Sequence, residues 1–138
     1  MEDFRSQLSA YIDELLAAGA HPVFLIIDLE GASQIKRTYD AEALDRFRAA
    51  ASDAISAAGG GCETFSYGEE RVIAVLPEVD RLRSFSIADK LRRGLPFLGQ
   101  SFDAVIHVDF DFLDYDPASG VAGLIAELTR PPVNRDVA

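Results

Sequence analysis

The residues of this sequence that are best suited to chemistry lie in one short polar segment, Gly68-Glu69-Glu70-Arg71. Two carboxylates and a guanidinium follow a glycine there, between a β-prone run that ends at Tyr67 and an apolar run that ends at Leu76. A polar, glycine-containing break between two such runs is typical of a β-hairpin turn. Because turns on a rigid scaffold often contain binding and catalytic residues, we expect function to be centred here.

A second pair of acids, Asp28 and Glu30, follows the strongest apolar run of the chain. Residues 22–28 have no polar interruption before Asp28, which is typical of a central strand that is covered on both faces. Acids at the end of such a strand lie where α/β folds usually place their sites. We therefore expect the end of this strand and the hairpin turn to form one site.

Composition and charge limit the classes of partner. The chain has 138 residues and a net charge of −10, so it would repel the phosphate backbone of a nucleic acid. No apolar run approaches the roughly 20 residues that cross a bilayer, and the acidic start of the chain does not resemble a signal peptide. The single cysteine, Cys62, excludes an internal disulfide and is expected to be a buried small hydrophobe. These features predict a cytoplasmic protein without membrane insertion.

Hydrophobic periodicity predicts an amphipathic N-terminal helix in residues 1–20, followed by one domain in residues 21–138. Further helices are expected over residues 32–39, 41–58, 80–95 and 121–128, and strands over residues 22–28, 62–67, 71–76 and 102–113. This order predicts an α/β (α+β) fold in which helices cover a central mixed β-sheet of about five strands.

The turn and its surroundings resemble the GGDEF domain, the diguanylate cyclase module of bacterial signalling. The segment Asp28-Leu29-Glu30 is similar to the Asp-x-Asp that ends the first strand of that family. Ser66-Tyr67-Gly68-Glu69-Glu70-Arg71-Val72 lies where the family has Arg-Tyr-Gly-Gly-Asp-Glu-Phe, and Val75-Leu76-Pro77 matches the end of its next strand. The resemblance covers residues 22–113 and implies the fold of a GGDEF domain.

The resemblance also implies roles for individual residues. A diguanylate cyclase joins two GTP molecules, one on each protomer of a dimer, and uses divalent metal ions to neutralise the triphosphates. By resemblance, Asp28 and Glu70 occupy metal-ligand positions and Asp45 occupies the position that reads guanine. Gly68 is the retained first glycine of the signature, beside the nucleotide.

The signature itself is degenerate, with the sequence Gly68-Glu69-Glu70-Arg71-Val72. Glu69 replaces the second glycine and obstructs the close backbone approach to a phosphate that glycine permits. Arg71 replaces the glutamate that is implicated in activating the attacking hydroxyl, and a guanidinium cannot act as a base. The resemblance therefore implies no catalytic residue in this chain. We expect Arg71 to pair with Glu69 or Glu70 and so to close the former site.

Other positions of the family are changed as well. Lys36 replaces the guanine-binding asparagine and offers no acceptor, so Asp45 is expected to form a surface ion pair with Lys36 instead. The product-inhibition site of the family would fall at Gly59 and Cys62 and is therefore absent.

These observations predict a catalytically inactive GGDEF-like domain that acts as a protein-interaction or regulatory module in bacterial signalling or cell organisation. We expect a protein partner or self-association and no cofactor, with magnesium needed only if GTP binding is retained. Two alternatives remain open: a non-catalytic GTP sensor that uses Asp28, Glu70 and Asp45, and a weak diguanylate cyclase that is active beside an intact partner. The apolar face of the N-terminal helix, with Phe4 and Leu8, would either cover the core or form a dimer.

Overall fold

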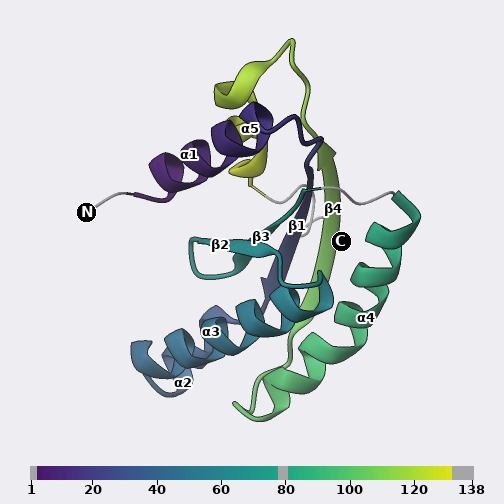
Figure 1. Cartoon of the computed structure of the whole chain (residues 1–138). Coiled ribbons are helices and arrows are strands. Elements are labelled where there is room, and N and C mark those ends of the chain that lie inside the picture. Colours follow the sequence, from purple (N-terminus) through teal and green to yellow (C-terminus); the bar gives the residue numbers. More distant parts are fainter. Residues whose placement is uncertain (1–2, 78–80, 132–138) are drawn as a thin grey trace.

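An antiparallel β-sheet with helices on both of its faces forms the framework of the chain (Figure 1). The computed structural model describes residues 3–77 and 81–131. The strands of these residues lie in the order β2-β3-β1-β4 and are β1 (Val23–Glu30), β2 (Glu63–Tyr67), β3 (Arg71–Leu76) and β4 (His107–Asp114). The helices are α1 (Phe4–Ala17), α2 (Ser33–Thr38), α3 (Ala41–Ala58), α4 (Arg81–Gln100) and α5 (Gly120–Leu128).

The sheet corrects the prediction in strand number and strand direction. In the described residues it has four strands rather than about five, and every neighbouring pair is antiparallel, so the sheet is not mixed. β1 and β2 run in the same direction, as expected for two strands that are joined through helices. However, β3 returns from the hairpin and lies between them. β1 and β2 are therefore parallel but not adjacent in the sheet.

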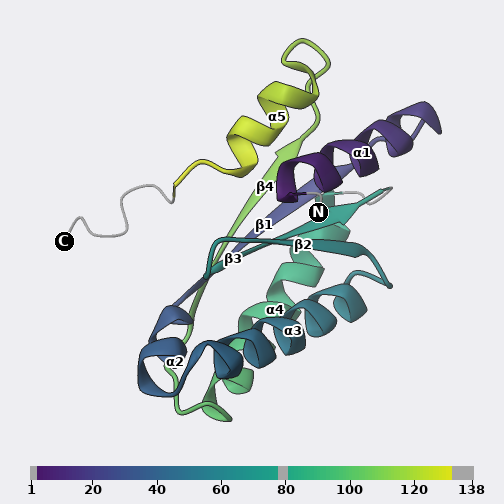
Figure 2. The ribbon, with the colours of Figure 1, turned by 90° about the vertical axis from the view of Figure 1, so that its left-hand side faces the viewer.

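Different helices cover the two faces of the sheet (Figures 1 and 2). α2, α3 and α4 lie toward one end and pack on one face, whereas α1 and α5 pack on the other face. Side chains of β1 alternate between these layers: Leu25 and Ile27 belong to the α3 and α4 side, and Phe24 and Ile26 belong to the α1 and α5 side. Six consecutive residues of β1 are buried, as predicted for a central strand.

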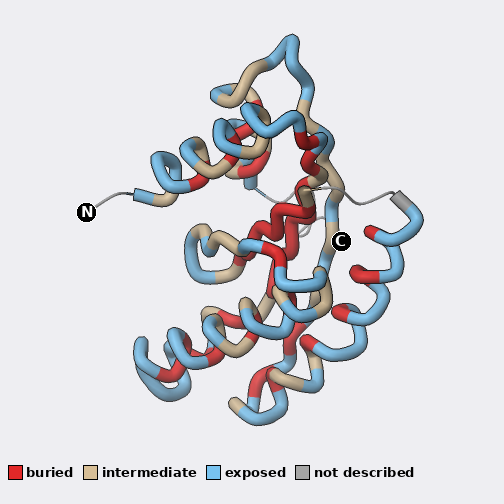
Figure 3. The backbone as a smooth tube through the Cα atoms, viewed as in Figure 1, coloured by how far each residue is buried: buried red, intermediate tan, exposed pale blue. Residues whose placement is uncertain are grey.

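Burial is concentrated in the middle of the sheet. Figure 3 shows the buried residues along β1 and β3 and on the inward faces of the helices. All six residues of β3 are buried, including Arg71 at its first position. A guanidinium in a fully buried strand requires partners, and these partners are a main feature of the site described below.

Local signals fix α3 at both ends. The side chain of Asp40 accepts a hydrogen bond from the backbone N–H of Ala43 at 2.8 Å, so it caps the helix. The helix ends at Ala58, directly before three glycines, and Gly60 and Gly61 adopt positive φ angles of 76° and 91°. The predicted bounds of this helix, residues 41–58, are confirmed.

The apolar face of α1 covers the core of the chain. Leu8 and Ile12 have no exposed surface and lie in the cluster that also contains Phe24 and Ile73. The ring of Phe4 contacts Tyr67 on β2 with a centroid distance of 5.0 Å. Of the two roles expected for this face, covering the chain's own sheet is the one that the structure shows.

Element bounds differ from the prediction near the end of α4. The helix continues to Gln100 through Pro96, beyond the predicted end at residue 95, and the predicted start at Asp80 lies outside the described residues. The next strand begins at His107 rather than at Phe102, because residues 101–103 form a turn in which Asp103 has a φ angle of 53°. In residues 3–77 and 81–131, no helix combines the length and the hydropathy that a bilayer-spanning segment requires.

We predict that the thiol of Cys62 reacts slowly while the chain is folded. Its side chain is 9% exposed, and burial raises the pKa of the Cys62 thiol above the ordinary value. Because only the thiolate attacks, the folded protein at neutral pH should react with dithionitrobenzoate at least about tenfold more slowly than the same protein in urea. Equal rates in the two states would contradict the burial of this side chain.

Candidate functional site

Arg71 and Asp28 form a buried ion pair at the end of the central strands. The two residues are register partners on β3 and β1. Arg71 Nε donates to Asp28 Oδ1 at 2.7 Å, and Arg71 Nη2 donates to Asp28 Oδ2 at 3.1 Å. The guanidinium therefore meets both carboxylate oxygens in the bidentate geometry that is strongest for this pair. The expected pairing of Arg71 with Glu69 or Glu70 is wrong.

The same guanidinium also binds the end of α5. Arg71 Nη1 donates to the backbone carbonyl of Leu128 at 2.9 Å and to that of Arg130 at 2.5 Å. Carbonyls in the last turn of a helix have no partner within the helix, and a cation there also complements the helix dipole. Arg71 thus joins β3, β1 and the C-terminal end of α5 through one planar group.

Burial makes this arrangement sensitive to the loss of any partner. Arg71 is 8% exposed and Asp28 is 9% exposed. A buried ion pair is weak evidence for net stability, because the cost of removing both charges from water offsets most of their attraction. Removing one partner leaves an unpaired buried charge, however, and costs about 3–5 kcal/mol.

Glu70 binds the chain that follows β1. Its Oε2 accepts hydrogen bonds from the backbone N–H of Gly31 at 3.1 Å, the backbone N–H of Ser33 at 3.0 Å and the hydroxyl of Ser33 at 2.9 Å. In addition, the backbone N–H of Leu29 donates to the Glu70 carbonyl at 2.6 Å. Ala32, the N-cap residue of α2, has no side chain that can accept a hydrogen bond from the start of the helix. Glu70, which is distant in the sequence, provides this acceptor instead.

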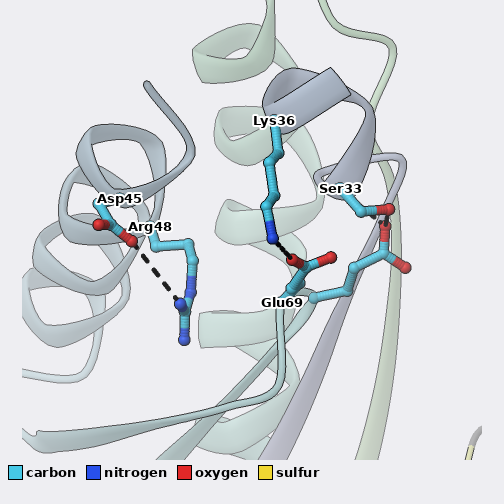
Figure 4. A network of polar contacts seen from close by, with 6 residues as sticks. Ser33, Lys36, Asp45, Arg48 and Glu69 are labelled. Atoms are coloured by element: carbon cyan, nitrogen blue, oxygen red, sulfur yellow. Dashed lines mark hydrogen bonds and ion pairs between the residues drawn. The ribbon is translucent and has the colours of Figure 1, made fainter. Parts of the chain in front are cut away.

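Lys36 and Asp45 have different partners from those predicted (Figure 4). Lys36 Nζ pairs with Glu69 Oε2 at 2.9 Å, and the exposed fractions of the two side chains are 51% and 45%. Asp45 pairs within α3 with Arg48 at 4.0 Å. The expected pair between Lys36 and Asp45 is therefore wrong. Lys36 lies on α2, directly beside the turn, and so contacts the nearer acid.

A shallow cleft of about 290 Å³ lies beside the turn. Gly68, with a φ angle of 64°, lets the chain reverse at its rim. The structure thus brings together the predicted residues Asp28, Gly68 and Glu70, whereas Asp45 does not line this cleft. The lining residues are Asp28, Tyr67, Gly68, Glu69, Glu70, Arg71, Thr129, Arg130 and Pro131.

Sequence reasoning missed the contribution of residues 129–131 to this cleft. The side chain of Arg130 suggests only a surface cation, whereas its backbone carbonyl is one of the groups that Arg71 binds. The buried Leu128 gave no signal of a role at the site, because a backbone acceptor is present at every residue. The signal in the sequence is Arg71 itself. A guanidinium at the start of an apolar strand needs hydrogen-bond acceptors, and these can come from distant parts of the chain.

The donor set does not fit a divalent cation in this arrangement. Magnesium requires accessible hard oxygen ligands. Both oxygens of Asp28 bind the guanidinium, and Oε2 of Glu70 accepts three hydrogen bonds. Across residues 3–77 and 81–131, no three histidine, cysteine or acidic side chains converge as a metal site would need.

Comparison with solved structures identifies the fold. The chain is similar to the GGDEF domain of DgcB from Caulobacter crescentus in complex with c-di-GMP, with a TM-score of 0.61 and 12% identity over 91% of this chain and 77% of that chain. It is also similar to the diguanylate cyclase SiaD from Pseudomonas aeruginosa, solved with its activator SiaC, with a TM-score of 0.63 and 14% identity over 90% of this chain and 52% of that chain.

A third similar structure, the GGDEF domain of another Pseudomonas aeruginosa protein, covers nearly the same length. Its TM-score is 0.57 and its identity is 18%, over 97% of this chain and 99% of that chain. No family model matches the sequence, and no curated protein matches it. The expected GGDEF-like α+β fold is confirmed. Because one fold can host different functions, the activity must be argued from the site.

We predict that Arg71→Met lowers the free energy of unfolding by about 3–5 kcal/mol, because the buried carboxylate of Asp28 loses the guanidinium that neutralises it. Adding Asp28→Leu should recover most of this loss, since apolar residues can replace a buried pair with little net cost. Urea unfolding measures both changes. Arg46→Met is the matched control: its pair with Glu42 is exposed, and its loss should cost less than about 1 kcal/mol. Equal losses for Arg71→Met and Arg46→Met would contradict the burial of the pair.

We predict a smaller effect for Glu70→Ala. The variant removes the acceptor for the backbone N–H groups of Gly31 and Ser33 and should cost about 1–2 kcal/mol. Glu70→Gln keeps an acceptor oxygen and should lose less. Hydrogen exchange of the Ser33 amide should be faster in Glu70→Ala than in Glu70→Gln. An unchanged exchange rate would show that Glu70 does not cap α2.

Proposed function

We propose that this chain is a GGDEF-like domain without diguanylate cyclase activity, and that it acts in the cytoplasm as a protein-interaction or regulatory module of c-di-GMP signalling. The fold and the position of the turn support the signalling context. The contacts of the charged residues in the hairpin turn support the absence of catalytic activity.

The pairing of Arg71 with Asp28 is the observation on which the proposal depends. By resemblance, a cyclase needs a proton acceptor at position 71 and a metal-binding carboxylate at position 28. The guanidinium of Arg71 accepts no proton and already neutralises both oxygens of Asp28. One substitution therefore removes two functions, because the residue that replaces the base also occupies the metal ligand.

Contacts of the neighbouring acids support the same conclusion. Glu70 uses Oε2 to hold Gly31 and Ser33 at the start of α2, so a metal ion could not bind both of its oxygens without uncapping this helix. Glu69 and Lys36 form an ion pair at the surface of the turn. A triphosphate that approached Gly68 would meet the carboxylate of Glu69, where the family has no side chain.

A role in protein contacts is supported by a structural relative. SiaD, of which this chain matches about half the length (52%), was solved as a complex with its activator SiaC, so a protein that contains a domain of this fold can have a regulatory protein as its partner. In our proposal the retained core serves to present a surface, and the former site serves to hold that surface rigid through Arg71.

The GTP-sensor function is the second candidate, because the cleft of about 290 Å³ beside Gly68 is still present. A sensor would have to bind the base without Asp45, which lies outside this cleft. GTP binding with no turnover would favour the sensor over the module.

The decisive test is an assay of the purified chain with GTP and magnesium, read by chromatography for cyclic dinucleotide and by calorimetry for binding. We predict no product, and no heat of binding with GTP at submillimolar concentration. An active diguanylate cyclase serves as the positive control, and a mixture of the two proteins tests whether this chain gains activity beside an intact partner. Arg71→Glu should also form no product, because Glu69 and Lys36 remain at the turn.

Product formed by the wild-type chain would refute the proposal. Binding of GTP without product would replace the module with the sensor. Extra product in the mixture, beyond that of the control cyclase alone, would favour the weak cyclase.

A further inference from the structure

β4 forms one edge of the sheet (Figure 1). It pairs with β1 through eight residues in a continuous register, and no strand of residues 3–77 and 81–131 lies on its other side. Eight residues of extended chain span about 26 Å. Because alternate N–H and C=O groups of an antiparallel strand point away from its neighbour, this edge can pair with a further strand.

The edge at β4 lacks the usual devices that prevent further pairing. Proline and lysine are common on protected edge strands, and neither occurs in the sequence of β4, HVDFDFLD. The other edge strand, β2, is shorter, with five residues. Two of its aromatic rings, Phe65 and Tyr67, contact rings of α1. β4 is therefore the edge that is better suited to an additional strand.

A backbone donor of β4 already binds a side chain in place of a strand. The N–H of Phe112 donates to Asp111 Oδ1 at 2.9 Å. The carboxylate oxygen accepts a bond of the kind that the carbonyl of a neighbouring strand accepts in a ladder. A strand that paired with Phe112 would replace this contact and would release the Asp111 carboxylate to bind a cation.

The face of β4 on the side of α1 and α5 is acidic. Asp111 is the register partner of Ile26, which packs on that side, and Asp109 projects to the same face two residues earlier. Both aspartates are exposed. Aspartate is among the residues that strands disfavour, so this pair is not explained by the formation of β4 itself. A strand laid along this edge would find favourable positions for cations here.

The opposite face of β4 is aromatic. Phe110 and Phe112 project toward α4, where the ring of Phe85 contacts Phe112 at a centroid distance of 4.9 Å. The guanidinium of Arg92 lies 5.2 Å from the centroid of Phe110. Phe85 remains 50% exposed. A further strand would find apolar surface on this side, whereas Arg92 would repel a cation there.

We propose that β4 is a docking site for an extended basic segment of another protein, which adds to the sheet as a further strand. Backbone hydrogen bonds to β4 provide the affinity. Alternate side chains provide the specificity, with cations toward Asp109 and Asp111 and apolar groups toward Phe85 and Phe112. Charge complementarity identifies the occupant as basic.

A second copy of this chain does not fit the same edge. Pairing of two β4 strands would bring Asp109 and Asp111 of both copies together, and each copy has a net charge of −10. The acids thus act against pairing between copies while they favour a basic strand. The edge is selective for a partner of opposite charge.

This inference deepens the proposed function by naming the chemistry of its partner, and it rests on that function only for its biological purpose. Peptide binding at β4 and the absence of cyclase activity are measured separately, so either can fail alone.

The test is fluorescence anisotropy of the full chain with three labelled eight-residue peptides. Lysine and valine alternate in the first, four lysines precede four valines in the second, and glutamate replaces lysine in the third. We expect the first to bind at submillimolar concentration and the second to bind at least about tenfold more weakly, because only alternation places cations and apolar groups on opposite faces of a strand. The third should not bind.

Hydrogen exchange locates the bound peptide. The alternating basic peptide should slow exchange of the Phe112 amide and leave the amides of β2 unchanged, because it adds to the β4 edge of the sheet. This measurement separates strand pairing from attraction by net charge, which protects no particular amide.

Two pairs of substitutions test the acidic face. Asp109→Asn/Asp111→Asn should weaken binding of the alternating basic peptide by about tenfold, because two ion pairs are lost. Asp109→Lys/Asp111→Lys should instead bind the alternating acidic peptide. Glu42→Gln/Asp53→Asn, which removes two exposed acids of α3, is the matched control and should leave the affinity unchanged. Thermal unfolding of each variant checks that the fold is retained.

Three results would overturn the proposal. One is a wild-type chain that does not bind the alternating basic peptide, or binds the second peptide equally well. Another is protection of β2 rather than of Phe112. The last is an equal affinity of the asparagine variant and the α3 control, which would show that Asp109 and Asp111 do not select the partner.

Discussion

The structure depends on one buried guanidinium. Arg71 reaches two distant parts of the chain at once, the carboxylate of Asp28 on β1 and the carbonyls of Leu128 and Arg130 at the end of α5. Because the group is planar and has five N–H donors, it can donate to all of these acceptors at once. The order of β3, β1 and α5 around the turn is therefore held by one side chain.

Glu70 and Arg71 connect the turn to helices on opposite faces of the sheet. Glu70, the last residue of the turn, binds the start of α2 on the side of α3 and α4. Arg71, the first residue of β3, points to the side of α1 and α5, as neighbouring residues of a strand do. A two-residue segment thus links both helical layers. The polar groups of this turn thus hold helices of both layers to the sheet.

The magnitudes separate the buried contacts from the exposed ones. The pair of Lys36 with Glu69 is half exposed, and such pairs contribute about 0–1 kcal/mol. The side chains of Arg71 and Asp28 are only 9% and 12% exposed, so breaking this pair carries the cost of a buried charge. The identity of residue 71, rather than the neighbouring surface charges, is consequently what decides the chemistry of the turn.

The sequence by itself determined the elements whose signals are local. The bounds of α3 follow from the cap at Asp40, the apolar stripe and the glycines after Ala58, and the double burial of β1 follows from its uninterrupted apolar run. Tertiary structure alone decided which acid Arg71 binds, how Glu70 is used, and that β3 separates β1 from β2. These outcomes depend on strand register and on backbone acceptors from residues far along the chain. A sequence pattern indicates the periodicity within a helix or strand, but it does not indicate which other element lies beside that helix or strand in the fold.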